Sequence, residues 1–401
     1  MSYLVFSSFD VGGLPFKIGK VLNRQGISTY YASIQPLHYG HDSKEFHYGD
    51  IKEDWDLSAH FRQQPFPEGV KEALKSIKRD ASIEACLATG WKSYILKASG
   101  IKYVYWSFGA DLDQLCFSPL WELQYPLWKK IIRYCMFVML KPKPMRFEAR
   151  MSLAYADSVL IAPYQVAAYR RLRMRKKLKF LPHLLDAKDF STLSREKRDS
   201  RKAICDQVGA RRFLFSSARH VWCGAQSKLS DNKGNDIAIR SFKYYVQMSG
   251  DTGSKLILVE KGEDACKSNA LAKDLGIDHL VVWVREMPRQ ELEVYYKGAS
   301  ICFGQFGTPC LTYSTLEPLS FGTPCISYYE GETTRRLGIP YYKELPPVVD
   351  SREPLEIARN IRELLSEDMK IEDLGYKSWL WTRRYCSEEN FARCFTRVFG
   401  T

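Results

Sequence analysis

Residues 299–327 read ASICFGQFGTPCLTYSTLEPLSFGTPCIS, and the five letters FGTPC occur in them twice. The apolar run before the first copy predicts a strand that ends in a Gly-Pro turn. A short helix should follow, with Ser314 and Glu317 spaced as in a capping box. The second copy ends that helix, because Gly322 can adopt a left-handed C′ conformation and Pro324 blocks continuation. The stretch therefore predicts a strand, a helix and a second strand in succession.

The same alternation of short strand-like runs and amphipathic stretches extends along the chain in both directions. Strands are expected over 3–9, 27–33, 102–106, 158–162, 212–218, 255–260, 279–284, 300–305 and 325–329. Helices are expected over 16–24, 82–98, 235–247, 264–275, 289–297 and 314–319. Such alternation is typical of parallel α/β units. Two doubly wound parallel sheets in tandem are the fold class that the pattern predicts.

A break in the periodicity divides the chain. The segment LPHLLDAKDF, residues 181–190, interrupts the helical pattern, and 401 residues are enough for about two domains. We expect a Rossmann-like N-terminal domain over 1–185 and a Rossmann-like C-terminal domain over 186–375. The aromatic helical pattern that ends the chain, 376–401, is expected to pack back across the domain joint.

Composition narrows the class of protein. With 45% hydrophobic and 26% charged residues, the chain has the make-up of an ordinary globular protein. The first residues have no basic n-region, and no run of about 18 apolar residues occurs, so we predict neither a signal peptide nor a membrane span and expect a cytoplasmic protein. The 11 cysteines are scattered without CxxC pairs. Reduced thiols, no zinc site and no metal cofactor are expected.

The formal charge of +13 is concentrated in two segments. Residues 170–179, RRLRMRKKLK, contain seven basic side chains, and residues 127–146 combine an apolar helical face with lysines and arginines. Such a helix can lie on an anionic membrane surface, which would place the protein at the inner face of the plasma membrane. The alternative is an ordinary core helix with a solvated face. Nucleic-acid binding is not indicated, because no nucleic-acid-binding motif accompanies the charge.

The turn that opens the short helix is the candidate ligand site. In open α/β sheets ligands bind beyond the carboxyl ends of strands, and a helix N-terminus there favours a diphosphate. Glu317, one turn into the helix, could accept hydrogen bonds from vicinal sugar or ribose hydroxyls. The alternative is that Glu317 only caps its own helix.

At these residues the sequence resembles the GT-B glycosyltransferases of the large retaining family 4, also called glycosyl transferases group 1. That family carries two glutamates separated by seven residues, followed by a small-residue turn. Glu317 and the turn at 321–324 match the second half, whereas Pro309 stands at the position of the first glutamate. The resemblance is strongest from Phe213 to Ser327 and implies two Rossmann-like domains facing a central cleft, the N-terminal one binding the acceptor and the C-terminal one the nucleotide sugar.

The resemblance also implies roles for individual residues. Arg219 and Lys233 match the two basic positions that bind the donor diphosphate, and fixed cations stabilise a departing diphosphate without a metal. Asp111 follows a strand end where the family has a histidine nearby, here replaced by Phe108, and is a candidate catalytic residue that would line the cleft. The alternative is that Asp111 caps the following helix. Further donor-binding positions are implied at Gly12, Gly13, Glu260, Val284, Arg285, Gln305, Ser314 and Thr315. Of these, Val284 and Arg285 are the candidates for contacts to the nucleotide base, while Trp283 is expected in the core.

These observations predict a hexosyltransferase that moves a sugar from a nucleotide donor to an acceptor hydroxyl, with retention implied by the family. The acceptor would be a glycan or lipid-linked molecule of the cell envelope, and the nucleotide sugar would be a co-substrate rather than a cofactor. A nucleotide-sugar epimerase of the same fold is one alternative. A catalytically silent binding module is the other, because the first glutamate and the histidine are missing.

Overall fold

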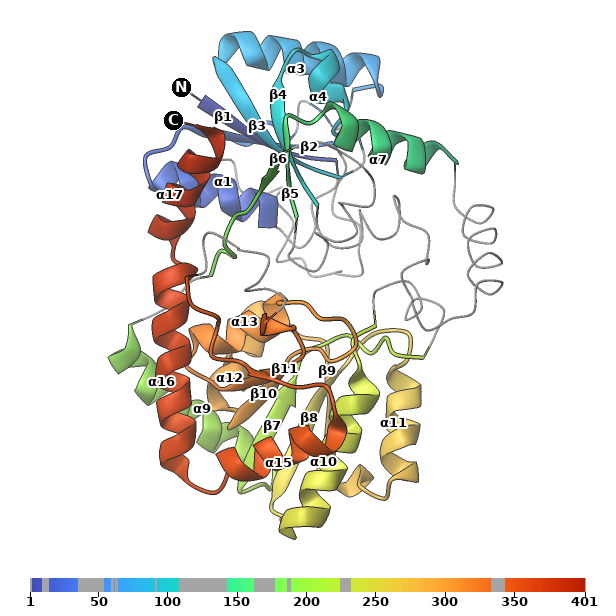
Figure 1. Cartoon of the computed structure of the whole chain (residues 1–401), viewed down its shortest axis with the longest axis vertical. Helices are drawn as coiled ribbons and strands as arrows, with labels where there is room; N and C mark the ends of the chain where they lie inside the picture. Colours follow the sequence, from blue (N-terminus) through green and yellow to red (C-terminus); the bar gives the residue numbers. More distant parts are fainter. Residues whose placement is uncertain are drawn as a thin grey trace. The chain divides into compact units, whose positions relative to one another are not determined.

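The computed structural model describes residues 2–8, 14–34, 54–58, 61, 64–90, 92–107, 143–161, 177–185, 189–223, 232–332 and 343–400. The chain forms two compact units. Unit 1 comprises Met1–Pro182 together with Glu388–Thr401, and unit 2 comprises His183–Ser387. Helices and strands carry the labels of Figure 1. Among the described residues no helix combines the length and apolar character that a membrane span requires.

Unit 1 is built on a parallel six-stranded sheet in the order β2-β1-β3-β4-β5-β6. Its strands are β1 (Ser2–Ser7), β2 (Thr29–Ser33), β3 (Ile83–Thr89), β4 (Lys102–Trp106), β5 (Ser158–Leu160) and β6 (Lys177–Lys179). Its helices are α1 (Leu14–Arg24), α3 (Glu68–Asp80), α4 (Ile95–Ala98), α7 (Lys143–Tyr155) and α17 (Glu388–Phe399). The central strands are buried along nearly their whole length, as expected of a parallel sheet covered by helices.

The last helix of the chain packs on the first strand. The ring of Tyr3 lies 5.3 Å from that of Phe395 and 5.5 Å from that of Phe399, centroid to centroid. In Figure 1 α17 runs beside α1 and β1. The helical pattern expected over 376–401 is therefore divided between two helices, α16 (Asp368–Tyr385) in unit 2 and α17 in unit 1.

The helix expected over 82–98 is wrong. Residues Ile83–Thr89 form β3, which pairs with β1 on one side and β4 on the other, and only Ile95–Ala98 is helical. A strand buried on both faces gives a continuous apolar run that periodicity cannot distinguish from a helix. Gly90, with φ +84°, ends the strand.

Unit 2 contains a second parallel six-stranded sheet, in the order β12-β11-β10-β7-β8-β9. Its strands are β7 (Arg212–Ser216), β8 (Ser254–Glu260), β9 (Val281–Arg285), β10 (Ile301–Phe303), β11 (Cys325–Ser327) and β12 (Val349–Asp350). Its helices are α9 (Phe190–Val208), α10 (Asn235–Ser249), α11 (Ala265–Asp274), α12 (Arg289–Gly298), α13 (Tyr313–Ser320), α15 (Pro354–Leu364) and α16, with a 3-10 turn at Asp278–Leu280.

The direction of the crossovers decides where a ligand can bind. From β7 the chain moves through α10 to β8 and on to β9, whereas from β10 it moves through α13 to β11 on the opposite side. Because parallel crossovers are right-handed, α10 and α11 cover one face of the sheet and α12 and α13 cover the other. Side chains of β7 alternate accordingly: Leu214 joins the core under α10, and Phe215 stacks on Tyr295 of α12. The switch point lies between the carboxyl ends of β7 and β10, where open α/β sheets bind ligands.

Candidate functional site

The loops after β7 and β8 are hydrogen-bonded to each other at the carboxyl edge of the second sheet. The N–H of His220 donates to the carbonyl of Lys261 over 2.7 Å, and the N–H of Asp264 donates to the carbonyl of His220 over 2.9 Å. Gly262 has φ +102°, and a Cβ there would lie 2.6 Å from the backbone N of His220. Only glycine fits this crossing. It brings the exposed Arg219 close enough to Lys261 for the two charges to interact.

Asp264 fixes the loop that carries Arg219. Its buried carboxylate accepts hydrogen bonds from the N–H of Trp222 over 2.8 Å and of Cys223 over 3.0 Å, and from Nζ of Lys267 over 2.9 Å. Burial alone would raise the pKa of Asp264, but the hydrogen bonds from Lys267 and from the two backbone groups hold that pKa well below its usual range. The loop after β7 is therefore anchored by a permanently charged side chain.

His220 supports the same loop from inside the protein. Its Nδ1 lies 2.7 Å from Oγ of Ser268, which also accepts a hydrogen bond from Nε1 of Trp222 over 2.8 Å. Burial lowers the pKa of His220 to about 4. A buried imidazole that is neutral at pH 7 and has no exposed edge cannot act as a proton shuttle for a bound ligand.

Lys233 lies between the two strand ends that form the switch point. Its N–H donates to the carbonyl of Val221 over 2.7 Å, and its carbonyl accepts from the N–H of Phe306 over 2.9 Å. The next residue, Gly234, has φ +65° and precedes α10; a Cβ there would lie 2.6 Å from the backbone N of Gly307. The expected Lys-Gly pair at the start of a helix is thus present, and its backbone joins the loops after β7 and β10.

Glu317 does not cap its own helix, so the predicted capping box is wrong. The N-cap residue of α13 is Thr312, without a side-chain cap hydrogen bond, and Oγ of Ser314 lies 2.8 Å from Oγ1 of Thr312. The helix starts one residue before Ser314, which places Glu317 beyond the first turn. Its Oε1 lies 3.3 Å from Nη2 of Arg289, the first residue of α12.

Glu317 is the acidic centre of a charged cluster. Its carboxylate lies close to the hydroxyl of Tyr296, which is 2.6 Å from Oγ of Ser217. Burial, followed by the charge of Glu317, raises the pKa of Tyr296. Burial lowers the pKa of Lys261; among its neighbours Glu286 and Glu317 act to raise it and Arg219 acts to lower it. Arg219 and Glu317, predicted from distant parts of the sequence, are therefore both near enough for their charges to act on Lys261.

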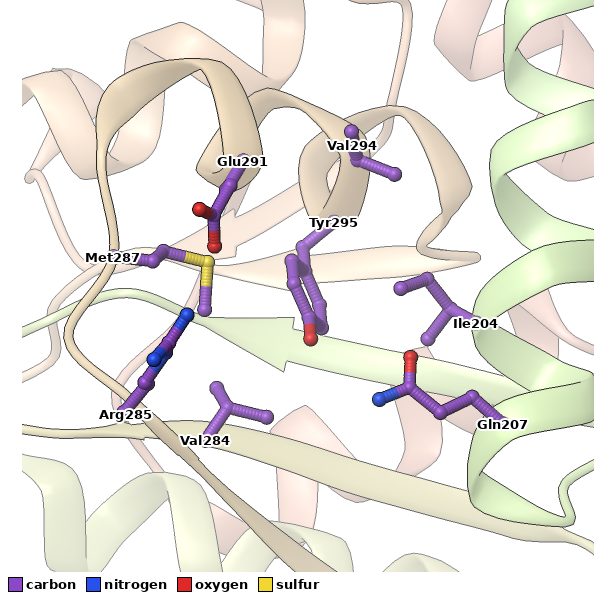
Figure 2. A pocket seen from close by; sticks show the side chains of 8 residues that line it. All are labelled: Ile204, Gln207, Val284, Arg285, Met287, Glu291, Val294 and Tyr295. Carbon is purple, nitrogen blue, oxygen red and sulfur yellow. The ribbon is translucent and has the colours of Figure 1, made fainter.

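A cavity of about 470 Å³ adjoins the charged loop after β9. Figure 2 shows Arg285, Met287 and Glu291 at one end, the ring of Tyr295 in the middle, and Gln207 and Ile204 of α9 at the other end. The remaining lining residues are Val284 and Val294. The two residues expected to contact a nucleotide base, Val284 and Arg285, thus line a hollow with an aromatic ring, a carboxylate and an amide. Trp283, as expected, packs against the core on the other face.

Several other predicted residues have different surroundings. Nε2 of the buried Gln305 donates to the carbonyl of Thr308 over 2.9 Å, and the hydroxyl of the buried Thr315 lies 3.0 Å from Oγ of Ser327. These side chains hold the turn between β10 and α13. Glu260 is exposed at the end of β8, beside Arg285 of β9.

The predictions for Gly12, Gly13 and Asp111 fall outside the described residues. The same holds for most of the two basic segments. Of 127–146 only 143–146 are described, as the start of α7, and of 170–179 only 177–179, as β6.

Three charged residues of the site were not predicted. Lys261 and Glu286 each directly follow a strand, and their Nζ and Oε1 atoms are 3.9 Å apart. Arg289 opens α12 directly after Pro288. Their positions in the sequence could have indicated them, since all three come just after a predicted strand or a proline turn. Within the described part of the chain, no group of three or more histidine, cysteine or acidic side chains is placed to hold a metal ion.

Comparison with known proteins identifies the fold. No protein-family profile and no curated protein matches the sequence. Among solved structures, HepE of Anabaena in complex with UDP and glucose matches with a TM-score of 0.63 at 11% identity, over 99% of this chain and 99% of that one. The chain has the GT-B fold.

Two further structures extend the comparison. Sucrose-phosphate synthase of Thermosynechococcus elongatus matches with a TM-score of 0.61 at 14% identity, over 100% of this chain and 98% of that one. WaaG, a glycosyltransferase involved in lipopolysaccharide biosynthesis, matches with a TM-score of 0.58 at 12% identity, over the whole of both chains. In this GT-B fold the charged cluster lies at the switch point of the second sheet.

The cluster has the chemistry of an anion site next to a hydroxyl site. Arg219, Lys261 and Lys233 belong to the loops at the strand ends, and the N-termini of α10 and α13 add the partial positive charge of helix dipoles. Glu317 offers acceptor oxygens to hydroxyl groups. A molecule that carries both a diphosphate and a ribose offers partners to both kinds of group.

Proposed function

We propose that the protein is a glycosyltransferase that moves a hexose from a nucleotide sugar to an acceptor hydroxyl. The observation that carries this proposal is the charged cluster at the carboxyl edge of the second sheet, where the loops after β7, β8 and β10 are hydrogen-bonded to one another and Glu317 pairs with Arg289 over 3.3 Å, beside a cavity of about 470 Å³. The fold shared with HepE, which was crystallised with UDP and glucose, supports a nucleotide-sugar donor.

The chemistry assigned to this site needs no nucleophile from the protein. As the bond between the sugar and the diphosphate breaks, negative charge develops on the departing phosphate, and Arg219 and Lys233 are proposed to stabilise it. If that phosphate accepts the proton of the attacking hydroxyl, the sugar is transferred with retention. The protein then contributes position and charge.

The donor is oriented by its nucleoside. Glu317 is proposed to accept hydrogen bonds from ribose hydroxyls, with Arg289 holding its carboxylate in place over 3.3 Å. The base would enter the cavity at the end formed by Arg285, Met287 and Glu291. Unit 1 is proposed to bind the acceptor, a glycan or lipid-linked molecule of the cell envelope.

An epimerase of the same fold would need a carboxylate or histidine placed for proton transfer. In the described part of the site Glu317 is paired with Arg289, and His220 is buried with a pKa lowered to about 4. Of the carboxylates at this edge, Glu286 and Glu291 remain candidates for such a role, and the assay of isomerisation decides between the two reactions.

The test is calorimetric titration of the full-length protein with UDP, GDP and ADP, followed by an assay of sugar release from the corresponding nucleotide sugars. We expect binding of one of these diphosphates, weakened at least tenfold by Arg219→Ala and by Lys233→Ala, and turnover that an acceptor increases. No binding of any of them would leave a silent module as the better account, and isomerisation of the sugar without an acceptor would favour the epimerase.

Docking on a membrane is a separate part of the proposal, resting on the basic residues of 127–146 and 170–179. Flotation with liposomes checks it. Anionic vesicles should carry the protein and neutral ones should not, because attraction between basic side chains and anionic lipid is electrostatic. Equal flotation on both would contradict this part alone.

A further inference from the structure

We propose that Lys261 binds the phosphate group attached to the ribose of the donor, and so distinguishes nucleotides from nucleosides. This inference rests on the proposed function and adds a contact that neither the sequence pattern nor the resemblance assigned. Lys261 directly follows β8, and its backbone is held by His220 and by the glycine at position 262.

The first argument is position. Lys261 interacts electrostatically with both Arg219 and Glu317, which are proposed to hold the two ends of the ribose-diphosphate. Lys261 therefore shares the electrostatic surroundings of both contacts at the carboxyl edge of the sheet, where a phosphate that joins them would be bound.

The second argument is hydrogen bonding. The Lys261 side chain is 21% exposed, and its Nζ lies 3.9 Å from Oε1 of Glu286, too far for a hydrogen bond. Within the described residues this ammonium group donates no hydrogen bond to protein, although it carries three donors. Its pKa is lowered, first by burial. A partly desolvated ammonium group without a close acceptor gains more from a phosphate oxygen than an exposed lysine does.

The third argument is charge balance. The charges of Glu286 and Glu317 act on Lys261 against that of Arg219, and Glu317 is already paired with Arg289. A phosphate that approaches Lys261 would replace the 3.9 Å interaction with Glu286 by a direct hydrogen bond. The side chain of Glu286 is 40% exposed.

The experiment uses three ligands that differ only in phosphate: the nucleoside, its monophosphate and its diphosphate, with the base that the wild-type protein prefers among uracil, guanine and adenine. Affinities are measured for the full-length wild type, Lys261→Met, Lys261→Arg and Arg219→Met, by calorimetry or by competition for weak ligands. Lys273→Met, an exposed lysine on α11, is the matched control.

We expect Lys261→Met to weaken the monophosphate and the diphosphate by similar factors, about 10-fold to 100-fold, the range of a hydrogen bond between charged groups. The nucleoside should change less than about twofold, because no phosphate contact is lost. Arg219→Met should weaken the diphosphate more than the monophosphate, and Lys261→Arg should retain most of the affinity.

Equal weakening of all three ligands by Lys261→Met would mean that Lys261 only supports the loop. Unchanged affinities for all three would mean that Lys261 takes no part in binding. Either result overturns the inference. The proposed function is judged separately, on whether the wild type binds the diphosphate at all. Thermal unfolding of each variant confirms that it is folded.

Discussion

Nη2 of Arg289 lies 3.3 Å from Oε1 of Glu317, joining the first residue of α12 to the middle of α13. Nε of the same guanidinium lies 3.6 Å from Oε1 of Glu293, one turn further along α12. Two carboxylates therefore share one cation, but only Glu317 is also close to Tyr296 and Lys261. This difference allows a binding role for Glu317 to be separated from a purely structural one.

Glu317→Gln should weaken the preferred nucleoside diphosphate about tenfold, because a charged acceptor for a ribose hydroxyl becomes a neutral one. The 2′-deoxy or 3′-deoxy form of that ligand should bind the wild type and the variant equally. Glu293→Gln is the control and should leave both affinities unchanged. A loss that is the same for the ribose and deoxyribose ligands would assign Glu317 a structural role only.

Gly234→Ala should destabilise the protein and weaken diphosphate binding. Residue 234 has φ +65°, and the added Cβ would lie 2.6 Å from the backbone N of Gly307. The left-handed conformation alone costs an alanine roughly 1–2 kcal/mol, and the collision adds to that. Gly250→Ala is matched, because Gly250 has φ +67° with nothing within 4 Å of its Cβ.

Chemical denaturation of both glycine variants separates the two costs. The variant at position 234 should lose more unfolding free energy than the one at 250, and only the former should lose affinity for the diphosphate, since only it displaces Lys233. Equal losses in the two variants would show that residues 234 and 307 are not in close contact.

His220 should make stability depend on pH in the acid range. Burial lowers the pKa of its imidazole from 6.5 to about 4 in the folded protein. Between these values the unfolded chain binds a proton that the folded chain does not, so stability falls as the pH drops from 6.5 toward 4, by up to about 1.4 kcal/mol per pH unit for one such group. His183, whose pKa burial also lowers to about 4, should add a similar dependence.

The variant His220→Asn keeps a polar atom near Ser268 and removes the titration. Urea denaturation at several pH values between 4 and 7 should give a shallower decline for the variant than for the wild type. His279→Asn, at an exposed position, should leave the slope unchanged. A variant slope as steep as that of the wild type would show that His220 is not buried in solution.

Lys197 of α9 should make stability depend on pH in the alkaline range, where, as for His220 in the acid range, stability increases with pH. Its ammonium group donates to the carbonyl of Gly322, just after α13. Burial, followed by the charge of Arg201, lowers its pKa from 10.5 to about 8. Between pH 8 and 10.5 the unfolded chain holds the extra proton, so stability should rise with pH across that window and be independent of this group below it.

Lys197→Met should abolish this alkaline rise, whereas Lys202→Met, at an exposed position of the same helix, should preserve it. Denaturation midpoints measured from pH 7.5 to 10.5 provide the comparison. If stability changes identically in both variants, Lys197 is solvated rather than buried behind α13.

The sequence predicted unit 2 better than unit 1 for a physical reason. In unit 2 glycines and prolines punctuate the elements: Gly250 ends α10, Pro288 precedes α12, and Gly322 follows α13. In unit 1 the central strand β3 is apolar along most of its length and continues into α4 after a short turn, so its pattern resembles a single helix.

The site was only partly accessible to sequence reasoning. Arg219, Lys233 and Glu317 could be named as candidates because they match positions in a family pattern, although no complete motif is present. Lys261 and Arg289 were not found, because their importance depends on which strand and helix ends are neighbours in space. Thr315 is the opposite case. The sequence indicates a donor contact there, but its hydroxyl is buried and lies within hydrogen-bond distance of Oγ of Ser327.

The central claim is that a nucleoside diphosphate binds at the carboxyl edge of the second sheet. Hydrogen exchange measured by mass spectrometry on the full-length protein, with and without saturating UDP, GDP or ADP, tests it most directly. We predict that one of these ligands slows exchange in the segments 216–223, 259–264, 285–291 and 312–319 together. Slowed exchange confined to other segments, or none with any of the three ligands, would contradict the account.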